Sequence, residues 1–203
     1  GYDLYFDDPE TSQERQDAVQ CHTSSNLDGA CEDRDIVLVA VQTPHDEAYD
    51  GREPTSHLSP KDFDYSHIKK VVKDIDDKVS EGTIISVIST MLPGTVREHI
   101  APLVKRGRFV YNPYLIAQGT VEYDMENPEM IMIGTEDGEV NDVVEKLYEL
   151  YDPMVKEGTR FEIGTWEEIE ATKVFYNTFI SAKLSLVNMI QDVAMKIGHM
   201  NVD

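Results

Sequence analysis

The stretch Ile36-Val37-Leu38-Val39-Ala40-Val41, followed by Gln42-Thr43-Pro44, decides the fold class of this chain. The run is apolar and mostly β-branched, as in a strand that is buried on both faces of a parallel sheet. Thr83-Ile84-Ile85-Ser86-Val87-Ile88 repeats the pattern and ends at Ser89-Thr90. Between the two runs, residues 65–80 place apolar side chains at intervals of three and four, which is the pattern of an amphipathic helix. The three segments therefore predict a strand-helix-strand unit.

The same alternation continues along the chain. The sequence predicts a helix after Pro93-Gly94-Thr95, strands near residues 109–111 and 130–133, and a helix over about 139–150. Strands that alternate with helices indicate an α/β fold with a doubly wound parallel sheet, covered by helices on both faces. Ligands of such sheets bind beyond the carboxyl ends of the strands. We therefore expect the functional residues in the turns that follow the strands.

Two of these turns carry hydroxyl groups. Thr43 and Pro44 follow the first strand, and Ser89 and Thr90 follow the second. A hydroxyl at a strand end can bond a phosphate, a ribose or a reacting oxygen, although each one taken singly is more often part of an ordinary turn or a helix cap. The occurrence of both favours a ligand site.

The segment from Trp166 to Ile197 contains no glycine or proline over about nine helical turns, which predicts one long helix or a closely joined pair. Its apolar residues cover more than one stripe of such a helix: Phe175, Phe179, Ile180, Ala182, Leu184, Leu186, Val187, Met189, Ile190, Val193, Ala194 and Ile197. A helix that is apolar on most sides must be buried on most sides, which implies a further domain, a second subunit or both. We expect one domain over residues 1–165 and the start of a second over residues 166–203.

Lys173 and Asn177 lie four residues apart on this predicted helix, so an ammonium and an amide share one face and can grip the same oxygen. The alternative is that Lys173 is a solvated surface lysine and that Asn177 is an interior residue bonded to the backbone. The apolar neighbours Phe175 and Phe179 argue against a wholly solvated face.

Composition limits the partners. The 203 residues include 39 acidic and 18 basic side chains, for a formal net charge of -21 at pH 7. Nucleic acid and anionic membranes are therefore poor partners, and no stretch approaches the roughly 20 apolar residues of a membrane span. Cys21 and Cys31 form no metal-ligand pattern with a histidine or with another cysteine, so no metal site is predicted. A reducing cytoplasm fits this composition.

Four blocks of the sequence carry a family resemblance. They are Val41-Gln42-Thr43-Pro44; Ser89-Thr90 with Pro93-Gly94-Thr95; Asn112-Pro113-Tyr114-Leu115-Ile116-Ala117-Gln118-Gly119-Thr120 with Asn127-Pro128; and Glu170-Ala171-Thr172-Lys173-Val174-Phe175-Tyr176-Asn177. They are similar, in this order, to the Val-x-Thr-Pro turn, the Ser-Thr-Val-x-Pro-Gly-Thr loop, the Asn-Pro-Glu-Phe-Leu-x-Glu-Gly segment and the Glu-x-x-Lys-x-x-x-Asn helix of one family. The chain thus resembles the UDP-glucose/GDP-mannose 6-dehydrogenases, which are NAD-dependent nucleotide-sugar dehydrogenases.

The resemblance implies a double oxidation, in which the C6 alcohol of a nucleotide sugar becomes an aldehyde and then a carboxylate, with NAD as cofactor. It assigns a catalytic role to Lys173, Asn177 and Thr90, with the lysine and the amide polarising the developing alkoxide. It also implies a homodimer formed through the long central helix, and a role in polysaccharide biosynthesis. The residues expected to contact the cofactor are Asp7, Thr43, Pro44, Ser89, Thr90 and Gln118.

The sequence also departs from the family pattern. The glycine-rich phosphate-binding turn and the motif with the nucleophilic cysteine are both absent, so we expect a piece of the enzyme, truncated at both ends and inactive alone. Tyr114 and Gln118 stand where the family carries two glutamates, one of which is the assigned base of the second half-reaction. Neither replacement accepts a proton readily at neutral pH, so that half-reaction is in doubt.

Two other readings remain open at this point. A related β-hydroxyacid dehydrogenase shares the Lys-x-x-x-Asn arrangement on its first central helix, although the block that begins at Asn112 favours the nucleotide-sugar enzymes. The chain alone is also consistent with a non-catalytic dimerising module.

Overall fold

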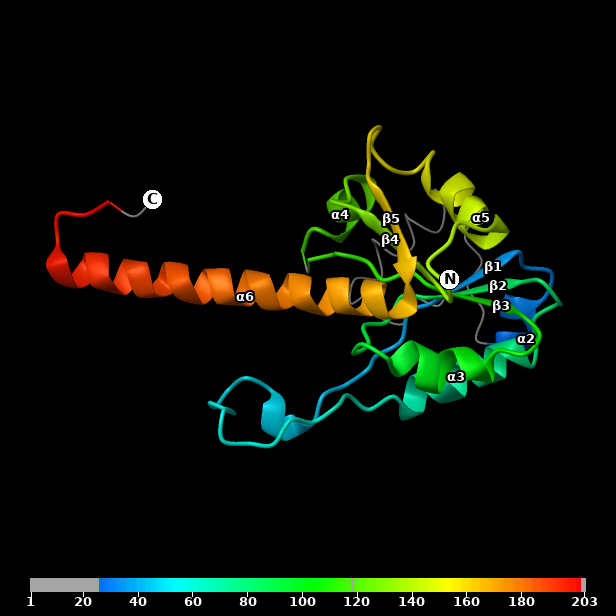
Figure 1. Cartoon of the computed structure of the whole chain (residues 1–203), viewed down its shortest axis with the longest axis horizontal. Helices are drawn as coiled ribbons and strands as arrows, with labels where there is room; N and C mark the ends of the chain where they lie inside the picture. The colour runs from blue at the N-terminus through cyan, green and yellow to red at the C-terminus, as the bar shows by residue number, and fades with distance from the viewer. Residues whose placement is uncertain (1–25, 118, 202–203) are drawn as a thin grey trace.

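Helices and strands alternate along the chain in the computed structural model, which describes residues 26–117 and 119–201 (Figure 1). The elements in chain order are α2 (Leu27–Cys31), β1 (Ile36–Val39), η1 (Glu47–Tyr49), α3 (Ser66–Asp76), β2 (Ile84–Val87), η2 (Val96–Ile100), η3 (Ala101–Leu103), β3 (Arg108–Tyr111), α4 (Val121–Glu126), β4 (Ile131–Thr135), α5 (Asp142–Tyr151), β5 (Phe161–Thr165) and α6 (Trp166–Ile197). Asp7, Cys21 and Gln118 lie outside the described residues.

The strands form a single sheet in the order β1-β2-β3-β4-β5. β1, β2 and β3 are parallel, and so are β4 and β5, but β3 and β4 pair antiparallel through Tyr111 and Gly134. The predicted α/β fold is confirmed, with this one antiparallel step in place of a wholly parallel sheet. Its physical reason lies in α4, which has only six residues and buries none of them, so it cannot act as a crossover helix packed on the sheet.

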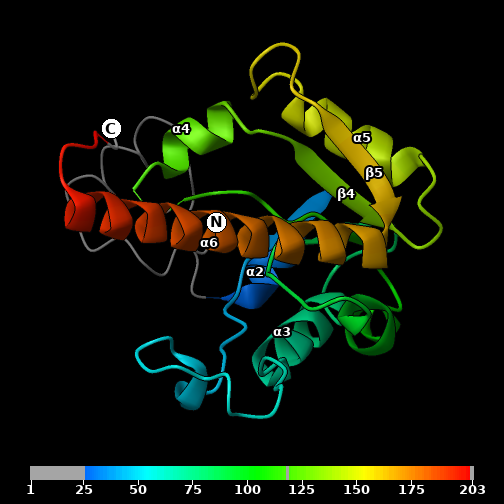
Figure 2. The same cartoon turned by 60° about the vertical axis from the view of Figure 1, so that its left-hand side comes forward.

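Helices cover both faces of the sheet, as predicted for a doubly wound fold (Figure 2). One apolar cluster joins the sheet to α3, η2 and the first turns of α6, and the other joins it to α5. The strands serve both clusters because alternate side chains point to opposite faces. In β2, for example, Ile85 and Val87 belong to the first cluster and Ile84 to the second.

Asp76 fixes the loop that leads into β3. Its side chain is 2% exposed and accepts hydrogen bonds from the backbone N–H groups of Lys105, Arg106 and Gly107, at 2.8, 3.0 and 2.9 Å. A Cβ atom at Gly107 would lie 2.8 Å from Ile85 Cδ1 and 3.0 Å from the backbone oxygen of Thr83, so a larger residue would force its neighbours to shift. The end of α3 and the start of β3 are thereby locked together.

Two regions differ from the sequence prediction. The helix expected after Thr95 forms only a π-helical turn followed by a 3₁₀ turn, η2 and η3, with a proline at the start of η3. Pro102 lacks the N–H group that a continuing helix requires. The strand β5 was not predicted, because it is short, contains Glu162, and buries only Gly164.

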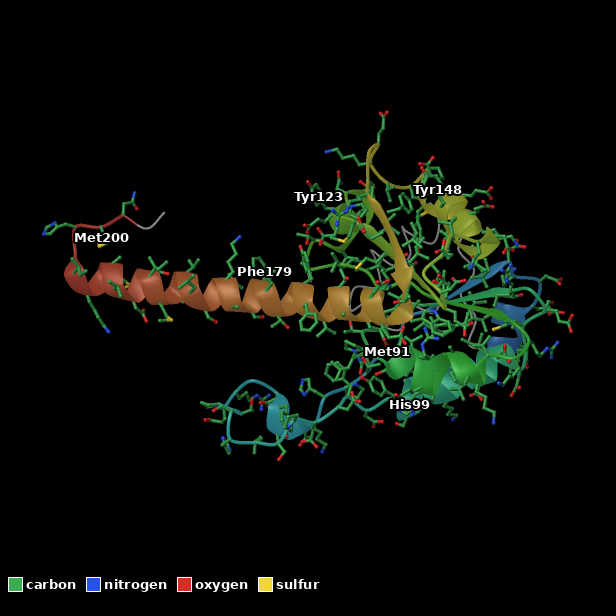
Figure 3. The ribbon with its side chains drawn as sticks, in the orientation of Figure 1. Met91, His99, Tyr123, Tyr148, Phe179 and Met200 are labelled. Carbon is green, nitrogen blue, oxygen red and sulfur yellow. The ribbon has the colours of Figure 1, made fainter. Side chains whose placement is uncertain are left out.

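The long helix α6 begins at Trp166, as predicted. Thr165 caps it through a capping box with Glu168, in which each residue's side chain accepts a hydrogen bond from the other's backbone N–H. The buried residues of its first turns are Trp166, Ile169, Glu170 and Lys173, whereas its later turns extend beyond the α/β body, with Phe179 70% exposed (Figures 1 and 3). No helix within the described residues is long and apolar enough to cross a membrane.

We expect Asp76→Ala to lower the free energy of unfolding by about 2–3 kcal/mol, because three backbone N–H groups lose their buried acceptor. Urea unfolding followed by circular dichroism measures the change. Asp77→Ala is the matched control, because that side chain is exposed and its removal should cost less than about 0.5 kcal/mol. Equal effects of the two substitutions would contradict the role of Asp76.

Candidate functional site

The turns that follow β1 and β2 are bonded to each other. Thr43 Oγ1 donates to the carbonyl of Thr90 at 2.8 Å, and Ser89 Oγ donates to the carbonyl of Val41 at 2.6 Å while accepting from its N–H at 3.0 Å. Ser89 is 8% exposed, so its hydroxyl serves the junction of the two strands. The structure thus brings the two hydroxyl-bearing turns together. The NAD contacts of Thr43, exposed Pro44 and Ser89 stay predictions.

The loop that carries Thr90 is held in place by Tyr65. Tyr65 accepts a hydrogen bond from the Leu92 N–H at 3.2 Å and donates one to Asp62 Oδ1 at 2.6 Å. Burial and the Asp62 carboxylate raise the pKa of Tyr65 to about 12, so the phenol stays protonated at physiological pH. Met91 is fully buried and lies beside the first turns of α6 (Figure 3). The loop therefore has little freedom to move relative to the sheet.

Glu170 fastens α6 to this same loop. Its side chain is fully buried, and its two carboxylate oxygens accept from the backbone N–H groups of Gly94 at 2.7 Å and Val96 at 2.8 Å. Burial raises the pKa of Glu170, and the two backbone donors act in the opposite direction. The sequence motifs include Glu170 but assign it no role. Its spacing of three residues from Lys173 could have indicated one, because it places both side chains on one helix face.

A second link between α6 and η2 lies nearer the surface. Arg97 donates to the carboxylate of Glu167 and, at 2.8 Å, to the carbonyl of Glu136. Its guanidinium also lies 4.8 Å from the centre of the Trp166 ring. The start of α6 is thereby fixed in both position and rotation.

Lys173 is a buried cation. It is 8% exposed, and its Nζ donates to the carbonyl of Tyr114 at 2.6 Å. Within the described residues no acidic side chain forms an ion pair with it, and burial alone lowers its pKa. This excludes a solvated surface lysine. A buried charge of this kind is costly to the fold, and such groups gather at functional sites.

Asn177 lies one turn beyond Lys173 and is exposed, so it is not an interior residue bonded to the backbone. Helical spacing places its amide on the same side as the lysine. Three turns and one helix therefore converge: the turns after β1 and β2 through Thr43 and Thr90, the turn after β3 through Tyr114, and α6 through Glu170 and Lys173.

The arrangement suits a dinucleotide whose reactive end lies over the carboxyl ends of β1 and β2. Thr43 and Thr90 are half-buried there, and the Thr90 hydroxyl donates to no group in the part of the chain that the structure describes. A half-buried hydroxyl that donates to no described residue, on a loop that Glu170 joins to the helix of Lys173, is a fitting environment for a ligand that carries hydroxyl and amide groups.

Comparison with known proteins identifies the family. The model of the NAD binding domain of the UDP-glucose/GDP-mannose dehydrogenase family matches residues 7–152. This chain belongs to that family. NAD is accordingly its cofactor, and the resemblance seen in the four sequence blocks is confirmed.

Relatives within the UDP-glucose/GDP-mannose dehydrogenase family are longer than this chain. The UDP-glucose 6-dehydrogenase of Rickettsia prowazekii is 25% identical over 167 residues, which make up 81% of this chain and 35% of the relative. The GDP-mannose 6-dehydrogenase of Pseudomonas aeruginosa is 28% identical over 179 residues, which make up 82% of this chain and 37% of the relative. The chain thus spans about a third of the length of these relatives.

Solved structures show the same fold. A ternary complex of GDP-mannose dehydrogenase from Pseudomonas aeruginosa matches with a TM-score of 0.75 at 24% identity, over 92% of this chain and 41% of that one. A UDP-D-ManNAc dehydrogenase from Pyrococcus horikoshii matches with a TM-score of 0.72 at 18% identity, over 98% of this chain and 45% of that one. The match includes α6 because it covers nearly all of this chain.

We expect Glu170→Gln to lower the free energy of unfolding by about 1–3 kcal/mol, because the amide turns an NH₂ group toward one of two backbone N–H donors. Glu145→Gln on α5 is the control, because that side chain is exposed. Urea unfolding of both variants measures the difference. A Glu170→Gln protein as stable as the control would show that the carboxylate does not hold η2.

We expect the stability of the wild type relative to Lys173→Met to rise with pH. Burial lowers the pKa of Lys173, so the folded chain releases this proton before the unfolded chain does, and stability increases between the lowered pKa and 10.5. Urea unfolding of both proteins at neutral pH and at pH 10.5 gives the double difference. Lys183→Met, at an exposed position of α6, should show no such change. A pH-independent difference for Lys173→Met would contradict the burial of the charge.

Proposed function

We propose that this chain is the cofactor-binding part of an NAD-dependent nucleotide-sugar 6-dehydrogenase, which in complete form oxidises the C6 alcohol of the sugar to a carboxylate in two steps. The observation that carries the proposal is the buried ammonium of Lys173, which forms no ion pair within the described residues. Its helix is bonded through Glu170 to the loop after β2, which belongs to the matched NAD binding domain. UDP-glucose and GDP-mannose are the sugars named in the family's description.

Lys173 acts as an electrostatic donor in this proposal. One of its three N–H groups is engaged by the Tyr114 carbonyl, which leaves two for an oxygen of the substrate. Asn177, one turn further along α6, adds an amide donor on the same side. Negative charge that develops on the sugar oxygen is stabilised strongly by fixed donors in a site with little water. The positive charge thus favours the reacting state over the neutral alcohol.

Thr90 positions the reacting group. Its backbone carbonyl is tied to Thr43 and its loop is fixed by Glu170, so its uncommitted hydroxyl has a defined location. The Thr90 hydroxyl can hold the reacting oxygen or a water molecule, and no binding energy is needed to order the loop first. When bound, NAD would supply the acceptor for the hydride of C6. In this proposal Thr43, Pro44 and Ser89 would hold it from the strand ends, and Asp7 and Gln118, which lie outside the described residues, are expected to contact it as well.

A second copy of the chain is the proposed partner of α6. Beyond its first turns this helix exposes a set of large apolar side chains: Phe175, Phe179, Ile180, Leu184, Leu186, Val187, Met189, Ile190, Val193, Met195 and Ile197. An apolar surface of this extent supports a homodimer formed through the helix. The charge of -21 disfavours nucleic acid and anionic membranes as partners, and the cytoplasm is the proposed location.

The test uses the complete gene product, supplied with UDP-sugars, GDP-mannose and short hydroxyacids, and follows NADH formation. We expect turnover with a nucleotide sugar, and a loss of about a hundredfold or more in kcat in Lys173→Met, because a donor to the developing charge is removed. Lys183→Met, at an exposed position on the same helix, should retain normal turnover.

Other outcomes of this assay decide between the alternatives. Turnover with hydroxyacids alone would identify a β-hydroxyacid dehydrogenase. Failure to oxidise any of these substrates, with NAD still bound in a calorimetric titration, would favour the non-catalytic module. Near-normal turnover in Lys173→Met would remove the lysine from the mechanism.

A further inference from the structure

A chain of hydrogen bonds runs inward from Tyr114, away from Lys173. The hydroxyl of Tyr114 bonds that of Tyr151 at the end of α5, and Tyr151 Oη donates to Asn112 Oδ1 at 2.6 Å. Asn112 Nδ2 then donates to the carbonyl of Met132 in β4 at 2.7 Å. Asn112 is fully buried and Tyr151 is 3% exposed, so the chain leads into the core. It links the turn after β3 to both α5 and β4.

The partners fix the direction of every proton in this chain. The Met132 carbonyl can only accept, so the Asn112 amide must present its NH₂ group there and its oxygen to Tyr151. The Tyr151 hydroxyl donates its single proton to that oxygen, so the Tyr114 hydroxyl must donate to Tyr151. The series ends on a peptide carbonyl that has no proton to give and none to take up. Tyr114 thus has no route by which to act as an acid or a base.

The same residue provides the acceptor for Lys173. The Tyr114 carbonyl lies 2.6 Å from Lys173 Nζ, and no other hydrogen bond of that ammonium lies within the described residues. The backbone that leads into Tyr114 is held as well, because the Asn112 N–H donates to the Val87 carbonyl at 2.8 Å and Pro113 has a fixed φ. Edge-to-face packing of the Tyr114 and Tyr151 rings, with centroids 5.9 Å apart, fixes the side chain.

We propose that Tyr114, Tyr151 and Asn112 are positioning residues that hold the Tyr114 carbonyl against Lys173 and so set the place and orientation of its ammonium. The inference rests on the function proposed for Lys173. It gives Tyr114 a structural role, as a rigid support for the cation without proton transfer. Burial raises the pKa of Tyr114, in agreement with a phenol that stays protonated.

The experiment compares Tyr114→Phe and Tyr151→Phe with Tyr148→Phe. Each substitution removes one hydroxyl and keeps the ring. Tyr148 is the matched control, because it lies on α5, is 48% exposed, and packs its ring on Phe161 (Figure 3). In this chain labelled with ¹⁵N-lysine, NMR reports the hydrogen exchange of the Lys173 ammonium, identified by its loss in Lys173→Met. A general loss of stability would not single out that resonance, and thermal unfolding confirms that each variant is folded.

We expect the ammonium protons of Lys173 to exchange about tenfold faster in Tyr151→Phe and Tyr114→Phe, the effect of loosening one hydrogen bond, and to be unchanged in Tyr148→Phe. In the complete gene product the first two variants should lower kcat about tenfold and leave the KM for NAD unchanged. If Tyr151→Phe does not fold, Tyr114→Phe decides alone, because its half-buried hydroxyl is the outer end of the chain.

An unchanged Lys173 resonance in a folded Tyr114→Phe or Tyr151→Phe protein overturns the proposal. A changed resonance in these variants, together with normal turnover in Lys173→Met, leaves the positioning intact and instead overturns the function proposed for Lys173. A change of the same size in Tyr148→Phe would show that the resonance reports general loosening of α5, and would also overturn the proposal.

Discussion

The arrangement of the site depends on the buried carboxylate of Glu170. A fully buried carboxylate must find donors within the protein, and the backbone N–H groups of Gly94 and Val96 are the ones it has. This requirement fixes the rotation of α6 about its axis as well as its distance from the loop after β2. Lys173 lies on the same face less than one turn further on, so it is directed at the turn after β3. One pair of hydrogen bonds thus joins the helix of Lys173 to the loop that carries Thr90.

The two charged residues on this face are treated differently. Glu170 receives two backbone donors, whereas Lys173 receives a single carbonyl and no counter-ion among the described residues. The fold could satisfy a lysine more fully or replace it by an apolar residue of similar size. Because the Lys173 ammonium has a single acceptor among the described residues, its other N–H groups remain for a ligand. The apolar clusters on the two faces of the sheet offset the free-energy cost of burying this charge. They include residues from the first turns of α6 and none from its later turns.

Sequence patterns predicted the features that depend on contiguous residues. The β-branched runs gave β1 and β2, the absence of glycine and proline gave the start and end of α6, and turn positions pointed to Thr43 and Thr90. What they missed depends on contacts between distant segments. β5 exists because β4 pairs with it, and the roles of Glu170 and Asp76 appear only when their carboxylates meet backbone far along the chain. The antiparallel step followed from the shortness of α4, which hydrophobic periodicity does not reveal.

The position of Lys173 on α6 also connects the site to the proposed dimer. It lies near the point where the helix leaves the α/β body: Lys173 is 8% exposed, and Phe175, two residues later, is 64% exposed. Asn177, on the lysine's side of the helix, is exposed as well. A second copy that covers the apolar surface of α6 would therefore adjoin the open side of the site, and would exclude water from the donors of Lys173. Electrostatic stabilisation grows as water is excluded, so dimer formation and the strength of the site are expected to rise together.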